Sequence, residues 1–269
     1  MSPELSLVIV NYNVKYFLEQ CIRSILDSKT EKSYEIIVVD NNSSDGSVER
    51  IKQLFPEVIL VENKENIGFS KANNKGFKKA QGKYVLILNP DTVLQENTIE
   101  KSLEFYKQKE NIGALGVRMI DGSGQFLRES KRGFPSPWTS FCKISGIYRF
   151  FPRSKIFNNY YQGHIDETET AEVDILTGAF MLVQKDILDK AGGFDEDYFM
   201  YGEDIDLSYT ISELGYQNYY FPETTIIHYK GESTRKGSLN YVKVFYQAMI
   251  IFAKKHLGKQ SSAWFVVFL

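Results

Sequence analysis

Three acidic positions lie where the ligand-binding groups of an α/β protein are usually found. Asp40 and Asp91 each follow an apolar run, and the run Glu-Asp-Ile-Asp occupies residues 203–206. Open α/β sheets bind their ligands outside the carboxyl ends of the strands. We therefore expect the three positions to gather at one edge of a sheet and to face a common ligand.

Asp40 ends the β-type run 34–39 and opens a loop of Asn, Ser, Asp and Gly residues. A carboxylate here can accept the imide hydrogen of uracil or thymine, while amides of the loop hold ribose or phosphate. An Asx turn is the ordinary role of such a residue. The local sequence leaves both roles open.

Asp91 follows residues 85–88, a continuous apolar run that is typical of a strand buried on both faces. Pro90 ends this strand because it has no amide hydrogen to give to the ladder. The carboxylate of Asp91 suits a hard cation such as Mg²⁺ or Mn²⁺ that bridges a diphosphate. Capping of the next helix is the alternative role.

The acidic run 203–206 begins a predicted helix. Acidic residues in a first helical turn usually serve to complement the helix dipole. This run also follows an aromatic, glycine-containing loop, 198–202, that suits a substrate cleft. Glu203 and Asp206 share one helical face, whereas Asp204 points elsewhere. A lone carboxylate aimed into a cleft can act as a general base.

The chain lacks the short motifs of several other functional classes. It has no Gly-x-Gly-x-x-Gly after a strand, no Gly-x-x-x-x-Gly-Lys-Ser/Thr and no Gly-x-Ser-x-Gly. Its net charge of −2 gives no general attraction to nucleic acid. Dehydrogenase, P-loop kinase, serine hydrolase and nucleic-acid-binding functions are therefore disfavoured.

Hydrophobic periodicity predicts the elements that must position these acids. We expect strands at 5–10, 34–39, 58–61 and 84–88, and helices at 14–25, 47–54, 70–80 and 96–108. This alternation predicts a right-handed, parallel, doubly wound sheet.

Beyond residue 113 the pattern changes. We expect a hairpin at 117–127, and a loop-rich insertion over the site at 130–161 in which short helices are an open alternative. Further elements are expected at 173–183 (strand-like, interrupted at Thr177-Gly178), 203–214 (helix), 219–221 and 225–227 (strands) and 238–257 (helix). The basic, apolar end of the chain could seat in a membrane surface. Packing on the protein body or on a partner subunit of a homo-oligomer is the alternative.

Three features of the sequence favour a cytoplasmic location. Two distant cysteines imply no disulfide framework. Residues 1–4 are too short and too acidic for the start of a signal peptide. No apolar run reaches the ~20 residues that span a bilayer. We expect a cytoplasmic protein, with peripheral contact to the inner face of the plasma membrane through 238–269 as an open alternative.

Several segments that occur in a fixed order resemble a known family. They are Leu7-Val-Ile-Val-Asn-Tyr-Asn13, Val38-Val-Asp-Asn-Asn-Ser-Ser-Asp-Gly46, Asn66-Ile-Gly-Phe-Ser-Lys-Ala-Asn-Asn-Lys-Gly76, Asn89-Pro-Asp91, and Gly192-Gly-Phe-Asp195 with Gly202-Glu-Asp-Ile-Asp-Leu207. Together they are similar to the inverting glycosyltransferases of family two, and most of all to bacterial rhamnosyltransferase-like members. The ordered set is far more specific than any one of its motifs.

The resemblance implies the GT-A fold, which is an α/β fold with a Rossmann-like, mostly parallel central sheet flanked by helices. The glycosyltransferase domain would comprise residues 1–235. Within it, 1–115 would bind the nucleotide and 116–235 would form an α+β acceptor half. Residues 236–269 would add an amphipathic helix and an apolar tail.

The resemblance also implies a role for individual residues. Asp204 would be the catalytic base, and Asp91 and His228 would bind Mg²⁺ or Mn²⁺. The substrate-binding residues would be Asn11 and Asn13 at the nucleotide, Asp40 at the pyrimidine, Thr177 and Gly178 near the acceptor, and also Asn89 and Glu203. In the mechanism we expect, Arg235 or Lys236 could help to stabilise charge on the departing diphosphate. Asn89 replaces the first aspartate of an Asp-x-Asp motif, so weaker metal affinity is expected.

The implied activity is transfer of a single hexose from a dTDP- or UDP-sugar to a glycan or lipid-linked acceptor in cell-surface polysaccharide assembly. No Gln-x-x-Arg-Trp follows the acidic run, which indicates one sugar per encounter rather than processive synthesis. A non-catalytic nucleotide-sugar-binding scaffold protein is the alternative. A sugar nucleotidyltransferase would need a basic, glycine-rich loop after the first strand, and residues 11–15 form no such loop.

Overall fold

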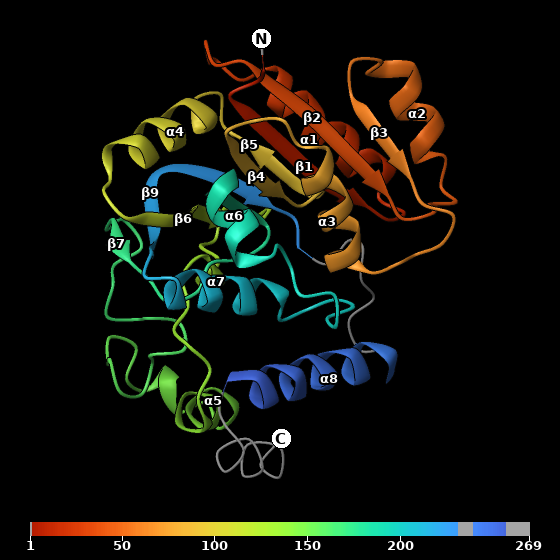
Figure 1. The fold of residues 1–269 in the computed structure, drawn as a ribbon. Helices are drawn as coiled ribbons and strands as arrows, with labels where there is room; N and C mark the ends of the chain where they lie inside the picture. The colour runs from red at the N-terminus through yellow and green to blue at the C-terminus, as the bar shows by residue number, and fades with distance from the viewer. Residues whose placement is uncertain (1, 231–238, 257–269) are drawn as a thin grey trace.

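The computed structural model describes residues 2–230 and 239–256, and a mixed sheet of nine strands forms the centre of this part of the chain (Figure 1). The strands are β1 (Leu5–Asn11), β2 (Tyr34–Asp40), β3 (Ile59–Glu62), β4 (Tyr84–Leu88), β5 (Thr92–Leu94), β6 (Ile112–Ile120), β7 (Ala171–Glu172), β8 (Phe180–Gln184) and β9 (Gln217–His228). The helices are α1 (Lys15–Leu26), α2 (Ser47–Leu54), α3 (Phe69–Lys79), α4 (Thr98–Gln108), α5 (Pro137–Ile144), α6 (Lys185–Ala191), α7 (Glu203–Glu213) and α8 (Leu239–His256), with short 3-10 turns η1 (Arg128–Ser130) and η2 (Ile147–Arg149).

The sheet has the order β3-β2-β1-β4-β8-β6-β9-β5, and β7 pairs with β9. The first four of these strands are parallel, as the alternation of strands and helices predicts. Strand β8 is antiparallel to both β4 and β6, and β6 is parallel to β9. Most strands therefore run in one direction, and the expected α/β class with a mostly parallel sheet is confirmed.

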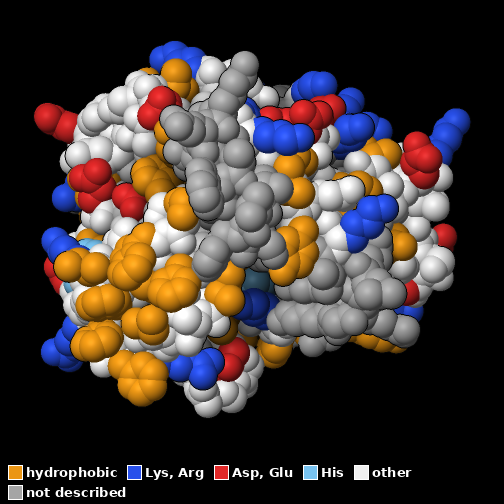
Figure 2. Space-filling view, turned by 90° about the horizontal axis from the view of Figure 1, so that it is seen from below, with side chains coloured by type: hydrophobic (Ala, Val, Ile, Leu, Met, Phe, Trp, Pro, Cys, Tyr) orange, Lys and Arg blue, Asp and Glu red, His pale blue; other side chains and the backbone are white. Residues whose placement is uncertain are grey.

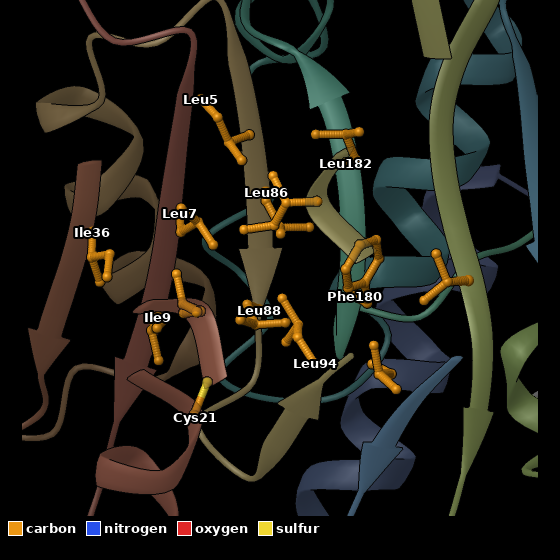
Figure 3. Close-up of a cluster of buried hydrophobic side chains, with 14 of the residues drawn as sticks. Leu5, Leu7, Ile9, Cys21, Ile36, Leu86, Leu88, Leu94, Phe180 and Leu182 are labelled. Carbon is orange, nitrogen blue, oxygen red and sulfur yellow. The ribbon is translucent and has the colours of Figure 1, made fainter. Parts of the chain in front are cut away.

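Alternating side chains of the central strands build a core on each face of the sheet. In β1, Leu5, Leu7 and Ile9 enter one core, and Val8 and Val10 enter the other. Figure 3 shows how strands β1, β2, β4 and β8 line the first core together. Helices α1, α2 and α4 cover this core, and α3, α6 and α7 cover the opposite one. Each fully buried Leu or Ile contributes about 1.5–3 kcal/mol, so the sheet is a firm base for the loops at its carboxyl edge.

The later part of the chain departs from the predicted elements in several places. The predicted hairpin at 117–127 is present but short: the returning chain pairs with the end of β6 only through the antiparallel bridge Ile120–Phe126 and the hydrogen bonds from Asp121 N to Gln125 O (2.8 Å) and from Leu127 N to Met119 O (2.9 Å). In the strand-like stretch 173–183, the regular strand β8 begins only after the predicted interruption at Thr177-Gly178. The two predicted strands near 219–227 are one strand, β9, with a register shift. Strand β5 was not predicted. The short strand β5 and the long strand β9 depend on pairing with strands that are distant in the sequence. Local hydrophobic periodicity does not predict such pairing.

The predicted insertion at 130–161 does contain short helices. Ser136 begins α5 with a capping box, in which Thr139 N donates to Ser136 Oγ (3.2 Å) and Ser136 N donates to Thr139 Oγ1 (2.7 Å). The buried Lys131 ammonium donates to the carbonyls of Gln162 (3.0 Å) and Ile165 (2.8 Å). Burial lowers the pKa of Lys131 to about 8. These contacts tie both ends of the insertion together.

Helix α8 packs on the body of the protein, next to α7 (Figure 1). Lys255 Nζ contacts Asp195 Oδ2 (2.6 Å) and Asp206 Oδ2 (2.9 Å). His256 Nε2 lies 2.6 Å from Asp206 Oδ1, and Phe252 is buried. The described part of the C-terminal segment thus follows the body-packing alternative, whereas the apolar tail lies outside the described residues. None of the described helices combines the length and hydrophobicity that crossing a membrane requires.

Candidate active site

A cavity of about 330 Å³ lies at the carboxyl ends of β1 and β4. Its walls also include the loops before β8 and α7, the first turn of α7, the end of β9 and part of α8. Asp91 and Asp204, which are 113 positions apart in the chain, both line this cavity. The structure therefore brings two of the three predicted acids to one site.

The pairing of β5 with β9 places His228 beside Asp91. The two strands are antiparallel, and Thr92 is the register partner of His228. His228 Nε2 consequently lies 3.3 Å from Asp91 Oδ1 and 3.4 Å from Asn89 Nδ2. Asp91 and His228 are both buried. The two predicted metal ligands and the asparagine that replaces an aspartate thus form one cluster.

The chemistry of this cluster fits a divalent cation that shares its shell with a ligand. Asn89 Oδ1 and His228 Nδ1 are buried and have no hydrogen-bond partner within the described residues. Mg²⁺ is usually held by one or two carboxylates together with phosphate oxygens and water. Among the described residues, no three His, Cys, Asp or Glu side chains form a metal cage. The carboxylate of Asp91 and the imidazole of His228 are ligand types that suit a divalent cation shared with phosphate oxygens.

Asp204, in the first turn of α7, is held by an arginine that the sequence analysis did not identify. Its Oδ2 accepts from Arg132 Nη2 (2.6 Å) and from Gly178 N (3.3 Å). Arg132 Nη2 also donates to Leu176 O (2.8 Å). Burial is the largest single influence and lowers the pKa of Arg132, but Asp204, Tyr160 and Glu129 together raise this pKa above its usual value. The ion pair and the Gly178 amide hold the Asp204 carboxylate in place at the edge of the cavity.

Glu203, the residue before Asp204, has a carboxyl group that favours its protonated form. Its side chain is buried, and burial followed by the charge of Asp204 raises the pKa of Glu203 to about 8. Its Oε2 has no hydrogen-bond partner within the described residues. At neutral pH the Glu203 carboxyl group therefore carries a proton and can act as a hydrogen-bond donor.

Thr177 and Gly178 lie on the loop between Asp204 and the cluster of Asn89, Asp91 and His228. Strands β4 and β8 pair with Leu88 opposite Phe180, and Asn89 N donates to Ala179 O (3.1 Å). The loop before β8 therefore runs directly past the end of β4. Both residues line the cavity, as the prediction of an acceptor-side position requires.

Asp40 is at the same edge of the sheet but does not line the cavity. Its Oδ1 accepts from Asn11 Nδ2 (2.8 Å), and its Oδ2 accepts from Ser43 N (2.8 Å) in the turn that was its alternative role. Asn11 and Asn13 do not line the cavity either, whereas Asn41, the neighbour of Asp40, does. Nucleotide binding by these three residues stays a prediction.

Some of the cavity wall comes from segments to which no site residue was assigned. Arg132 and Tyr160 come from the insertion, and Met249 and Phe252 come from α8. The many aromatic and basic residues of the insertion were the sequence feature that could have indicated a role for Arg132 and Tyr160 in the site. The α8 residues had no such signal, because a hydrophobic helix looks the same whether it covers a cavity or a core. Arg235 lies outside the described residues.

Comparison with known proteins gives related enzymes that cover most of both chains. N-acetylglucosaminyl-diphospho-decaprenol L-rhamnosyltransferase of Mycobacterium tuberculosis (strain ATCC 25618 / H37Rv) is 28% identical over 274 residues, which span 96% of this chain and 87% of that protein. Rhamnosyltransferase WbbL of Escherichia coli (strain K12) is 24% identical over 238 residues, which span 85% of this chain and 84% of that protein.

Solved structures with the same fold include two complexes. The mannosyltransferase PcManGT from Pyrobaculum calidifontis, in complex with GDP-Man and Mn²⁺, has a TM-score of 0.66 at 18% identity and covers 100% of this chain and 73% of its own. S. aureus TarS 1–349 in complex with UDP-GlcNAc has a TM-score of 0.63 at 17% identity and covers 98% and 70%. These likenesses confirm the GT-A fold. Residues 6–192, well over half of the sequence, match the pattern of Glycosyl transferase family 2, and the chain belongs to that family.

Proposed function

We propose that this protein transfers a single sugar from a pyrimidine nucleotide sugar to a glycan or lipid-linked acceptor during synthesis of a cell-surface polysaccharide. The observation that carries the proposal is the shared cavity of Asp91 and Asp204. Two relatives that match over most of their length, described above, are both named rhamnosyltransferases, which favours L-rhamnose as the transferred sugar. In this proposal the donor base is thymine or uracil, and the Asp40 carboxylate accepts the imide hydrogen of that base.

Asp204 is the general base in this proposal. Its carboxylate takes the proton of the acceptor hydroxyl as that oxygen attacks the anomeric carbon, while the bond from this carbon to the diphosphate oxygen breaks. A single in-line displacement inverts the anomeric configuration. Arg132 and the amide of Gly178 hold the carboxylate at the cavity wall, within hydrogen-bond distance. Glu203, protonated at neutral pH, can donate a hydrogen bond to a sugar or acceptor oxygen without repelling the diphosphate.

Asp91 and His228 would hold the divalent cation, Mg²⁺ or Mn²⁺. When bound, the cation would neutralise charge that develops on the departing diphosphate. Asn89 supplies an uncharged carboxamide beside it, so this chain provides one formal negative charge from Asp91 rather than two. A higher cation concentration for half-maximal activity is expected from this composition than from a two-aspartate site.

The test is nucleotide release from dTDP-, UDP- and GDP-sugars in the presence of Mn²⁺ and a polyprenyl-diphospho-N-acetylglucosamine acceptor. We expect release with a pyrimidine donor that requires the acceptor and yields one added sugar with inverted configuration. Asp204→Asn is expected to retain donor binding and to lose transfer by about 10²–10⁴-fold. Glu213→Gln, an exposed acid at the far end of α7, is the matched control and is expected to be unchanged.

Two results would contradict the proposal. Transfer by Asp204→Asn at the wild-type rate would remove Asp204 as the base. Donor binding without turnover on any acceptor of the panel would favour the alternative function, a nucleotide-sugar-binding scaffold protein.

A further inference from the structure

The insertion between β6 and β7 carries a group of exposed hydrophobic side chains outside the cavity. We call it the aromatic-basic surface, and its apolar members are Trp138, Phe141, Ile144, Phe150, Phe151 and Ile156. Phe150 is 81% exposed, Ile144 67% and Ile156 62%. Figure 2 shows hydrophobic side chains gathered on one side of the lower face, with Lys and Arg side chains at their border. Large exposed apolar groups of this kind mark interaction sites.

The aromatic-basic surface is held in place by contacts among its own residues. The rings of Phe151 and Phe157 stack at 4.7 Å, and those of Trp138 and Phe141 stack at 5.8 Å. Trp138 Nε1 donates to Ile156 O (3.0 Å) and so joins α5 to the segment after η2. The exposed side chains are therefore presented on an ordered scaffold rather than left over from a loose loop.

Residues 131–164, which contain the aromatic-basic surface, carry charged side chains of one sign only. Residues 131–164 contain six Lys and Arg residues and no Asp or Glu, although the whole chain has a net charge of −2. Arg149, Arg153 and Lys155 are exposed, whereas Lys131 and Arg132 are engaged inside the fold. The cations available to a partner thus stand among the protruding apolar side chains.

We propose that the aromatic-basic surface docks on an anionic phospholipid bilayer. Protruding Phe, Ile and Trp side chains can enter the headgroup and upper acyl region, while Lys and Arg attract anionic lipids. The absence of acidic side chains from 131–164 matches the negative charge of such a surface and disfavours a partner that carries both signs. This docking places a different part of the chain on the membrane from the C-terminal segment considered in the sequence analysis.

Docking through this surface also orients the cavity. Arg132, Pro135 and Tyr160 of the same insertion line it, so its acceptor side would lie close to the lipid headgroups. The inference depends on the surface itself and not on the identity of the donor sugar. Lipid binding can therefore be present even if the proposed reaction is wrong, and the two are tested separately.

The experiment is flotation of the full chain with vesicles of phosphatidylcholine alone or phosphatidylcholine mixed with phosphatidylglycerol. We expect binding to the anionic vesicles that weakens with added salt. Ile144→Ser/Phe150→Ser and, separately, Arg153→Glu/Lys155→Glu are each expected to weaken it by about tenfold or more. All four side chains are exposed, so the variants should unfold at the wild-type temperature.

Two matched controls remove the same kinds of group elsewhere. Tyr16→Ser/Leu26→Ser changes exposed apolar residues of α1, and Lys78→Glu/Lys79→Glu reverses two exposed charges of α3. Both controls should bind anionic vesicles as the wild type does. No vesicle binding, or binding that the controls weaken as much as the test variants, would overturn the proposal. Concentration-dependent self-association that Ile144→Ser/Phe150→Ser abolishes, without lipid binding, would assign the surface to a second copy of the chain and would also overturn it.

Discussion

Replacing Glu203 with glutamine tests the electrostatic description of the site without using activity. In the folded protein, burial and the charge of Asp204 raise the pKa of Glu203 from 4.5 to about 8. Between these two values the folded state holds a proton that the unfolded state has released. Stability is therefore fully present below about pH 4.5 and falls as the pH rises towards 8.

The expected magnitude follows from this one proton. One proton of difference changes the free energy of unfolding by about 1.4 kcal/mol per pH unit. Between pH 5.5 and 7.5, the raised pKa of Glu203 should therefore lower the free energy of unfolding of the wild type by roughly 2–3 kcal/mol. Glutamine resembles the protonated form, so the variant should match the wild type near pH 4.5. It should become progressively more stable than the wild type as the pH rises.

Urea unfolding followed by circular dichroism at pH 4.5, 5.5, 6.5 and 7.5 measures this difference. Glu213→Gln, on the exposed end of the same helix, should keep the wild-type pH dependence. Parallel pH profiles for Glu203→Gln and the wild type would refute the reasoning, because they would show that Glu203 is ionised in the folded protein.

Three further changes test other parts of the structure. Arg132→Gln leaves the partly buried Asp204 without its cation and should lower the free energy of unfolding at pH 7 by about 3–5 kcal/mol, measured in urea; a loss below 1 kcal/mol would contradict the buried ion pair. His228→Ala should raise the Mn²⁺ concentration that gives half-maximal donor binding, measured by calorimetry, by about 10-fold or more, and an unchanged value would remove it as a ligand. Gly76→Ala should destabilise the fold by about 1–3 kcal/mol, because its Cβ would lie 2.4 Å from Val8 Cγ1; wild-type stability would show that α3 and β1 are less closely packed than described.

The sequence supports those features of the fold that are encoded locally. The apolar runs of β1, β2 and β4 are continuous, and the polar residues that follow them mark the carboxyl edge of the sheet. Asp91 could be assigned to the site for this reason, since Pro90 ends its strand. The contact between His228 and Asp91 is not local, because it requires β9 to pair with a strand of three residues. Its assignment in the sequence analysis came from the family resemblance.

Arg132, the ion-pair partner of Asp204, is a second contact that the sequence alone did not predict. Arg132 reaches Asp204 because its backbone pairs with Ile175, which is far from it in the chain and lies in no regular strand. An arginine in a loop-rich segment has no periodic signal to distinguish it from its neighbours. The position of α8 over the cavity is a similar case, because Phe252 would appear equally buried against any apolar surface. Such contacts are set by tertiary packing.

The pairing of β5 with β9 has a consequence for biosynthesis. A growing polypeptide leaves the ribosome from its N-terminus, and domains acquire structure as their segments emerge. His228 is the last residue of β9. Strand β9 pairs with both β5 and β6. A nascent chain that has exposed only β1 to β8 therefore holds Asp91 without its neighbouring ring. The proposed activity should consequently begin only after β9 has been translated and has paired with β5.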